Sequence, residues 1–561
     1  MKRVRPLNHK GTALIFAYFA ISILLILIGT ITCRAVSELN NSRRHMAFIE
    51  ALYLGEGAIE SVVYNLAYAV VNHQTEPVAS TPTDISILSF PPSIGFLPSG
   101  FSATYTCEAI DSDQTITNAI GIATIVKNYR VTATASTSEF LSSGNPLSVS
   151  VNQIIARKKT YTFQHAVFYA DDLEILPGPN MILSGKVHSN SDIYLGANNA
   201  LTIDSEYLYS AGDIYNCRKD RVAIPSGGIS IKVKDGATYE LMKKSGEPNP
   251  LDSLRSDWTS ESQTRWNGTV KSSVHGVNAL AVPEVGSIQP NGYYAGTADI
   301  TIDNGVLRKN GFVLADGVDV PAGTIQTTTT MYNNREGKTI RMTEIDMKKL
   351  AGYDVGDPPG SPSFPNNLPE DLGAGEGGLI YATRDDAGVN EQNGVRLKSG
   401  EEIFNRPKGV TVVSNLPVYV QGDYNRYNQK PASVICDAVN VLSNSWNDGT
   451  GYAVPSDTYI YAAFISGVDT TTSGDYNGGL ENYPRMHENW SNSPRKTLYI
   501  RGSFVELWNS VFAQGEWIYG GPYYTAPTRD WDYDPSYNNI NNLPPYTPFA
   551  VEMARVAWWR N

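Results

Sequence analysis

The sequence predicts an α+β chain that is mostly β. A long N-terminal helix, transmembrane in its first part and amphipathic in its second, precedes a β-rich ectodomain. Three observations predict this class. Residues 11–33 carry no charged side chain, and no proline occurs between Pro6 and Pro77. Beyond residue 100, short runs of alternating apolar and polar residues are separated by Gly, Asn and Pro, which is typical of strands and turns.

The uncharged segment is long enough to cross a bilayer. Thr12 to Cys33 are 22 residues, which span about 33 Å as a helix. A cleaved signal peptide fits poorly, because the apolar run is too long and no A-x-A site follows it. The positive-inside rule therefore predicts that residues 1–10 stay in the cytoplasm and that the rest is exported. The basic residues that set this orientation are Lys2, Arg3, Arg5 and Lys10.

The helical pattern continues beyond the apolar segment. Residues 12–72 are predicted to form one helix of about 90 Å, whose second half presents an apolar face to the ectodomain. Gly55 and Gly57 each weaken a helix by roughly 1 kcal/mol relative to Ala, which favours a bend there. The residues that predict the apolar face are Ile49, Leu52, Tyr53, Ile59, Val63, Leu66 and Val70.

This N-terminal region resembles the type IV pilin and pseudopilin superfamily, and within it the PilX/GspK-type minor pilins. The resemblance implies cleavage by a prepilin peptidase after Gly11, so that Thr12 becomes the first mature residue. Most major pilins carry a glutamate at the fifth mature position, whereas this chain has Phe16, as in the PilX/GspK group. The residues that carry the resemblance are Gly11-Thr12-Ala13-Leu14-Ile15, Arg34-Ala35, Glu38, Ser42, Arg43 and the run ALYLGEGAIE at 51–60.

The resemblance implies a function in filament assembly. The chain would be a minor pilin or pseudopilin that acts in assembly, priming or tip adhesion of a type IV pilus-like filament. Its partners would be the membrane, other pilins and minor pilins, and the prepilin peptidase. It would be a single-pass protein of the bacterial inner membrane, reaching the pilus or cell surface after assembly. The alternative is a membrane-anchored ectodomain that binds or cleaves a glycan and uses a pilin-like stalk.

Composition divides the chain into five expected regions. Three strand-like runs at 102–109, 128–136 and 147–163 predict an antiparallel sheet packed against the exposed half of the helix. Short apolar segments recur after residue 165, and they favour a β-solenoid, with a β-sandwich as the alternative. Six of the nine tryptophans follow residue 489. The expected regions are a leader at 1–11, the stalk helix at 12–76, the sheet at 77–164, the solenoid-like domain at 165–420 and an aromatic-rich C-terminal domain at 421–561.

No enzymatic motif is found in the sequence. HExxH, GxSxG and CxxC are all missing, and we expect no enzyme, although glycan cleavage stays open because two distant carboxylates suffice for it. The net charge of −12 argues against nucleic acid as a partner. Cys107, Cys217 and Cys436 follow the membrane segment, so at most one intramolecular disulfide can form among them.

Two candidate sites lie near the C-terminus. Tryptophans and tyrosines there predict either a platform that stacks sugar rings or contacts a protein, or the core of this region. Asp530, Asp532 and Asp534 alternate as at the start of a calcium loop, although Pro535 replaces the glycine of an EF-hand. Calcium is the one cofactor that the sequence suggests. The aromatic candidates are Trp490, Trp508, Trp517, Tyr519, Tyr523, Tyr524 and Trp531.

Overall fold

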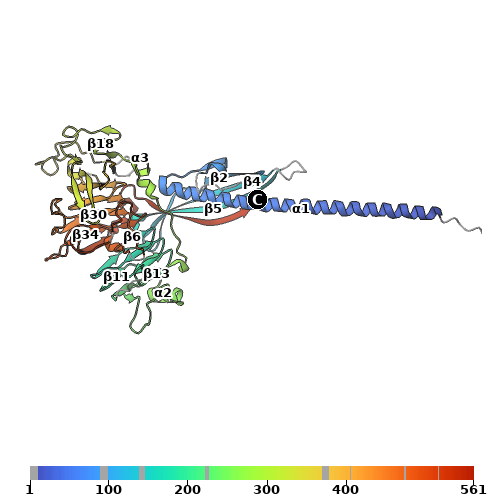
Figure 1. Cartoon of the computed structure of the whole chain (residues 1–561), viewed down its shortest axis with the longest axis horizontal. Coiled ribbons are helices and arrows are strands. Elements are labelled where there is room, and N and C mark those ends of the chain that lie inside the picture. The colour runs from blue at the N-terminus through green and yellow to red at the C-terminus, as the bar shows by residue number, and fades with distance from the viewer. Residues whose placement is uncertain are drawn as a thin grey trace, which may run out of the picture.

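A single long helix projects from a β-rich body (Figure 1). This computed structural model describes residues 10–88, 99–137, 146–220, 226–368, 378–404, 406–472, 475–515 and 517–560. The basic residues expected to orient the chain at positions 2, 3 and 5 lie outside these ranges. The predicted class, a long N-terminal helix followed by a β-rich ectodomain, is confirmed.

The helix α1 (Lys10–His73) is 64 residues long and unbroken, which corresponds to about 95 Å. Every side chain from Gly11 to Met46 is exposed, and the most apolar stretch has a mean hydropathy of 2.7. This helix is therefore long and apolar enough to cross a membrane. Its first half extends away from the body (Figure 1).

The second half of α1 packs on a sheet through small residues. Ile59, Leu66 and Val70 are buried as predicted, but Tyr53 is 68% exposed. A Cβ at Gly55 would lie 3.0 Å from Val151 Cγ2. Gly55 thus permits close contact between helix and strand, and the helix continues through it without a break. The buried face comprises Ala47, Ala51, Leu54, Ala58, Ile59, Val62, Leu66 and Val70.

The sheet against α1 is antiparallel and has six strands in the order β1-β2-β4-β5-β37, with β3 paired to β4. The three predicted strands are confirmed. The strand β37 comes from the far end of the chain and pairs along the length of β5. The bounds are β1 (Ala79–Asp84), β2 (Phe101–Ala109), β3 (Gln114–Thr117), β4 (Ala123–Thr137), β5 (Leu147–Tyr161) and β37 (Phe549–Arg560).

Residues 167–533 form a β-solenoid, not a sandwich, because successive short strands stack in parallel on separate faces. Its first half makes three coils and ends with the helix α2 (Trp258–Trp266) and the short strand β16 that follows it. The strands of this half are β6 (Val167–Tyr169), β7 (Leu173–Ile175), β8 (Met181–Ser184), β9 (Val187–Ser189), β10 (Ile193–Leu195), β11 (Ala200–Asp204), β12 (Leu208–Ser210), β13 (Ile214–Tyr215), β14 (Gly228–Lys232), β15 (Tyr239–Leu241) and β16 (Val270–Lys271).

The second half begins at the opposite end of the solenoid. Between the halves lies the short helix α3 (Tyr293–Thr297), and α4 (Met347–Leu350) follows β22. The strands are β17 (Ile300–Asp303), β18 (Val306–Lys309), β19 (Phe312–Val313), β20 (Ile325–Gln326), β21 (Thr330–Asn333), β22 (Lys338–Asp346), β23 (Gly378–Thr383), β24 (Glu391–Lys398), β25 (Gly400–Glu402), β26 (Val410–Val413), β27 (Val418–Gln421), β28 (Tyr424–Tyr427), β29 (Ala432–Cys436), β30 (Val439–Leu442), β31 (Thr458–Ile460), β32 (Ala463–Ser466), β33 (Arg485–Met486), β34 (Thr497–Gly502), β35 (Phe504–Glu506) and β36 (Thr528–Tyr533).

The coils are not stacked in the order of the sequence. Along the longest sheet the order is β16-β12-β9-β6-β35-β32-β29-β26-β23-β17. The chain therefore enters at the middle, winds to one end, returns to the other end and winds back to its starting point. There β35 pairs in parallel with β6, so the first and last coils touch. We call this junction the seam.

The strand pairing divides the chain differently from the regions expected from composition. The expected boundary at residue 420 falls inside β27, and β37 belongs to the sheet of the stalk. Because β5 leads into β6 and β37 follows β36, the solenoid is an insertion between two neighbouring strands of that sheet. The aromatic-rich region expected at 421–561 therefore consists mostly of the later coils of the solenoid and is not a separate domain.

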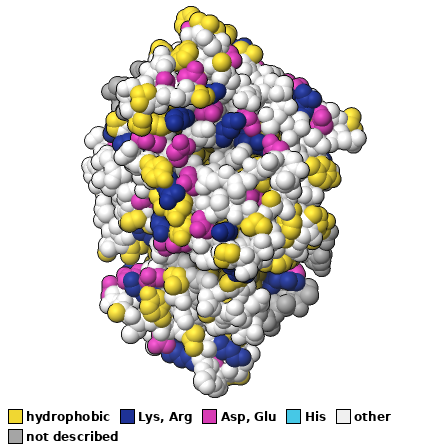
Figure 2. Space-filling view, turned by 90° about the vertical axis from the view of Figure 1, so that its left-hand side faces the viewer, with side chains coloured by type: hydrophobic (Ala, Val, Ile, Leu, Met, Phe, Trp, Pro, Cys, Tyr) yellow, Lys and Arg dark blue, Asp and Glu magenta, His cyan; other side chains and the backbone are white. Residues whose placement is uncertain are grey.

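The solenoid extends across the direction of α1, from β18 at one end to α2 at the other (Figure 1). The face turned away from the helix mixes Lys and Arg with Asp and Glu and with small apolar patches (Figure 2). Because β5 of the stalk sheet leads into β6, the stalk meets the solenoid near the middle of the solenoid, beside the seam.

Candidate functional site

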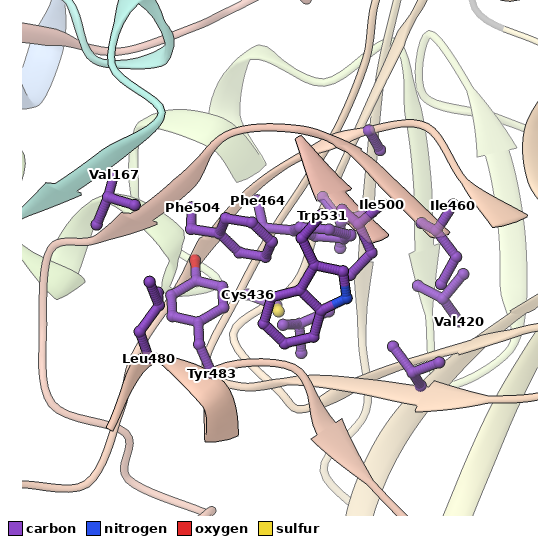
Figure 3. Close-up of a cluster of buried hydrophobic side chains, with 14 of the residues drawn as sticks. Val167, Val420, Cys436, Ile460, Phe464, Leu480, Tyr483, Ile500, Phe504 and Trp531 are labelled. Carbon is purple, nitrogen blue, oxygen red and sulfur yellow. The ribbon is translucent and has the colours of Figure 1, made fainter. Parts of the chain in front are cut away.

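Large apolar side chains fill the solenoid where the two halves meet. Phe504 of the last coil lies near Val167 of the first coil (Figure 3). The ring of Phe504 lies 5.3 Å from that of Trp531 and 5.5 Å from that of Tyr483. All of these residues are buried. The seam is therefore closed by a shared core as well as by strand pairing.

Buried carboxylates also bridge the seam. Glu506 accepts hydrogen bonds from the backbone N–H groups of Ala170, at 3.1 Å, and Asp171, at 3.2 Å. Glu481 accepts one from the backbone N–H of Leu176, at 3.0 Å. Burial raises the pKa of Glu506 to about 8 and the pKa of Glu481 to about 7. Glu506 and Glu481, which belong to the second half, thus bind the backbone of the first half.

A pocket of about 520 Å³ opens at this seam. Residues of both halves line it, so it exists only where the first and last coils meet. The first half contributes Leu176, Gly178, Pro179, Asn198, Arg218 and Ser226, and the second half contributes Tyr476, Gly478, Glu481, Trp517, Tyr519, Tyr524, Ala526 and Arg529.

Four aromatic side chains form one wall of the pocket. Trp517 Nε1 donates a hydrogen bond of 2.7 Å to the Tyr524 hydroxyl. Tyr476 meets the Trp517 ring edge-on, with centroids 5.3 Å apart, and Tyr519 meets Tyr524 edge-on at 5.7 Å. Gly478 has φ +91°, and a Cβ there would lie 2.6 Å from the Trp517 ring. The glycine therefore leaves the space that the indole occupies.

The charged groups of the described pocket lining are one carboxylate and two guanidinium groups. Arg218 binds Asp220 through two hydrogen bonds of 2.7 and 2.6 Å and lies over the Tyr476 ring at 4.8 Å. Arg529 donates to the backbone carbonyl of Glu481 at 3.4 Å. Within the described part of the chain, Glu481 Oε2 and Arg529 Nε have no hydrogen-bond partner. A donor and an acceptor thus stay unpaired beneath the lining of one pocket.

The predicted aromatic residues do not form one surface platform. Trp517, Tyr519 and Tyr524 line the pocket. Tyr523 is half-buried against the solenoid core. Trp490, Trp508 and Trp531 are only 0%, 8% and 4% exposed, so they build the interior. Sequence reasoning missed Arg218, Tyr476, Glu481 and Arg529, because no local pattern links residues from the two halves.

The three predicted calcium ligands bind other groups. Asp530 and Asp532 lie 2.9 and 3.3 Å from Arg501 Nη1. Asp534 accepts hydrogen bonds from the backbone of Ser536 and the side chain of Gln429. The described ranges contain no group of three or more His, Cys, Asp or Glu side chains that could hold a metal ion. Asp530 and Asp532 thus converge on a guanidinium group, whereas Asp534 is bound separately.

Cys33, Cys107 and Cys436 form no disulfide bond. Cys107 is buried in the sheet of the stalk and Cys436 in the solenoid. Burial raises the pKa of the Cys107 thiol to about 12. Neither thiol is a nucleophile in this environment.

The expected processing residues lie at the start of α1. Gly11 and Thr12 are exposed in its first turns, and Phe16 is 75% exposed. A Cβ at Gly11 would meet no atom within 4 Å. Among the described residues, nothing packs against this end of the helix.

Comparisons with known proteins give little further information. No family model matches the chain, and no curated protein matches it. One similar solved structure is the competence-associated pilin ComZ from Thermus thermophilus, which is 10% identical, with 92% of this chain and 97% of that chain covered. The TM-score is 0.23, which does not establish a common fold.

Proposed function

We propose that this chain is a minor pilin or pseudopilin of a type IV pilus-like filament. The observation that carries the proposal is α1, which is exposed from Gly11 to Met46, carries no charged side chain from Gly11 to Cys33, and then packs on an antiparallel sheet. An apolar helix surface of this size is not stable in water. Lipid would cover it before assembly, and the helices of sibling subunits would cover it afterwards.

The shape of the body supports a low copy number. Ten strands, from β16 to β17, stack along the longest solenoid sheet, which corresponds to about 45 Å at the usual strand spacing. Packed helices lie only roughly 8–10 Å apart. A solenoid that extends across the helix leaves little room for identical neighbours along a thin shaft. A position at the filament tip, in an initiating complex, avoids this clash.

Phe16 supports the same position. A carboxylate in lipid is costly unless it is paired, and the fifth-position glutamate of major pilins is thought to pair with the amine of a neighbouring subunit. Phe16 suits the apolar bilayer but offers no such partner. A subunit without this carboxylate fits the end of a filament better than its repeating shaft.

The mature N-terminus tests the proposal. In cells with an active prepilin peptidase, mass spectrometry should identify Thr12 as the first residue, and Gly11→Val should leave the leader attached. The matched control is Gly29→Val, which changes a glycine of the same helix away from the cleavage site. An intact leader in the wild-type chain would contradict the proposal.

The position in the filament needs a separate experiment. Quantitative mass spectrometry of sheared filaments should find this chain far below the major pilin, and immunogold should label filament ends. Even labelling along the shaft would contradict the tip position.

A further inference from the structure

We propose that the seam pocket binds a neutral sugar ring, a hexose or N-acetylhexosamine unit of a surface polysaccharide. This proposal does not depend on the filament function, because it rests on the pocket alone. The pocket has about 520 Å³, within the range of roughly 300–1,000 Å³ that small-molecule sites have.

The aromatic wall suits the apolar face of a sugar. Trp517 and Tyr476 are partly exposed, and Tyr519 is 49% exposed. The polar atom of the Trp517 indole is already bound to Tyr524. What this side chain offers to a ligand is therefore its apolar ring surface, against which the C–H groups of a pyranose pack.

The polar side chains on the pocket surface suit hydroxyl groups. Asn198 and Ser226 line the pocket, are exposed, and offer an amide and a hydroxyl. Glu481 Oε2 and Arg529 Nε lie beneath this surface, without a hydrogen-bond partner among the described residues. A sugar hydroxyl both donates and accepts, so it can pair with the Asn198 amide or the Ser226 hydroxyl.

The charge balance of the pocket favours a neutral ligand. Arg218 is neutralised by its two hydrogen bonds to Asp220. Glu481 and Arg529 remain, and burial raises the pKa of Glu481 to about 7, so this carboxyl is only partly ionised near neutral pH. The described lining thus carries no large excess of either charge. The wall therefore recognises shape and hydroxyl groups, not net charge.

The proposal concerns binding. Glycoside hydrolysis ordinarily uses two carboxylates on either side of the scissile bond. Glu481 is the one carboxylate among the described lining residues. Because the lining comes from both halves, a bound sugar would hold the first and last coils together and raise the melting temperature.

The test uses the full chain in a detergent without a sugar headgroup, such as lauryldimethylamine oxide. Calorimetry with four trisaccharides of similar size separates the ligand classes: cellotriose and N-acetylchitotriose are neutral, glucosamine trimer is cationic and galacturonate trimer is anionic. We expect one of the neutral trimers to bind with a Kd of about 1 mM or below. Absence of binding by both at about 20 mM, or tighter binding of a charged trimer, would overturn the proposal.

Three variants link binding to the pocket. Tyr519→Ala should weaken binding by about tenfold without changing the melting temperature, because Tyr519 is half-exposed. Tyr476→Ala, which removes another ring of the same wall, should also weaken binding. The control is Trp558→Ala, an aromatic residue in β37 with the same 49% exposure, which should leave binding unchanged. Equal affinity of Tyr519→Ala and the wild-type chain would place the sugar elsewhere and overturn the proposal.

Discussion

The stalk and the solenoid are held together in opposite ways. In the stalk, α1 and strands β2 to β5 lie within residues 10–161, and one distant strand, β37, completes the sheet. In the solenoid, each coil pairs with the next, but closure depends on the contact of Phe504 with Val167, 337 residues apart (504 − 167). The stalk is therefore mainly a local structure with one long-range strand. In the solenoid, the first and last coils are distant in the sequence and must pair with each other for the structure to close.

This difference makes the seam the place where the solenoid is most sensitive to substitution. Phe504→Ala removes a nearly buried ring from the core shared by both halves. We expect the free energy of unfolding to fall by about 4 kcal/mol. Chemical denaturation of the full chain in detergent measures it. Phe312→Ala, at a ring that is 78% exposed at the end of the solenoid, should have almost no effect, and similar losses in both variants would contradict a seam that closes the fold.

The same difference explains what the sequence could predict. The helix and the strands β2, β4 and β5 follow from local periodicity, and the solenoid follows from short apolar segments between turn residues. The seam could not be predicted, because no residue near Val167 specifies Phe504 as its neighbour. For the same reason the pocket residues Arg218 and Arg529 could not be linked. Composition also does not distinguish Trp517, on a pocket wall, from Trp531, inside the core.

The strand β37 connects the two regions, and its buried side tests that connection. Val551 is 2% exposed, packs in the core beneath α1 and pairs with Ala281 in the segment between the solenoid halves. Val551→Asp buries an unpaired carboxylate, which should cost about 3 kcal/mol. Val556→Asp makes the same change in the same strand at a side chain that is 60% exposed, and it should cost little. Proteolysis near residue 281 should increase only in the first variant, and equal behaviour would argue against β37 as the link.

The buried carboxylates predict that stability depends on pH. The pKa of Glu481 and Glu488 is raised to about 7 and that of Glu506 to about 8, mainly by burial, from an ordinary value of 4.5. The folded state therefore binds protons more tightly than the unfolded state, and these carboxyls lower the stability as pH rises from about 4.5 to 7 or 8. Buried His165 and His188, with pKa values lowered to about 3 and 4, act in the opposite sense below pH 6.5. Lys159 and Lys186, with pKa values lowered to about 8 by burial, act in the opposite sense above pH 8.

Glu506→Gln isolates one of these groups. The amide keeps an acceptor for the backbone of Ala170 and Asp171 but cannot ionise. Between pH 6.5 and 8.5 the wild-type chain should lose about 2 kcal/mol more stability than this variant. Glu401→Gln, at a half-exposed carboxylate of β25, should keep the wild-type slope. Parallel melting curves for Glu506→Gln and the wild type would show that Glu506 is not protonated in the folded state.

The smallest expected effect lies in the stalk, at Gly55, and it is a balance of two opposing terms. Gly55→Ala should gain about 1 kcal/mol from helix propensity. The new Cβ would lie 3.0 Å from Val151 Cγ2, so Val151 must shift, and overpacking costs roughly 1 kcal/mol or more. We therefore expect a net change close to zero in thermal unfolding of the full chain. In a Val151→Ala background the clash is removed, and Gly55→Ala should then stabilise the chain by about 1 kcal/mol relative to Val151→Ala alone. Additive effects of the two substitutions would mean that the helix and β5 are not in close contact at this point, and that the glycine serves the helix backbone alone.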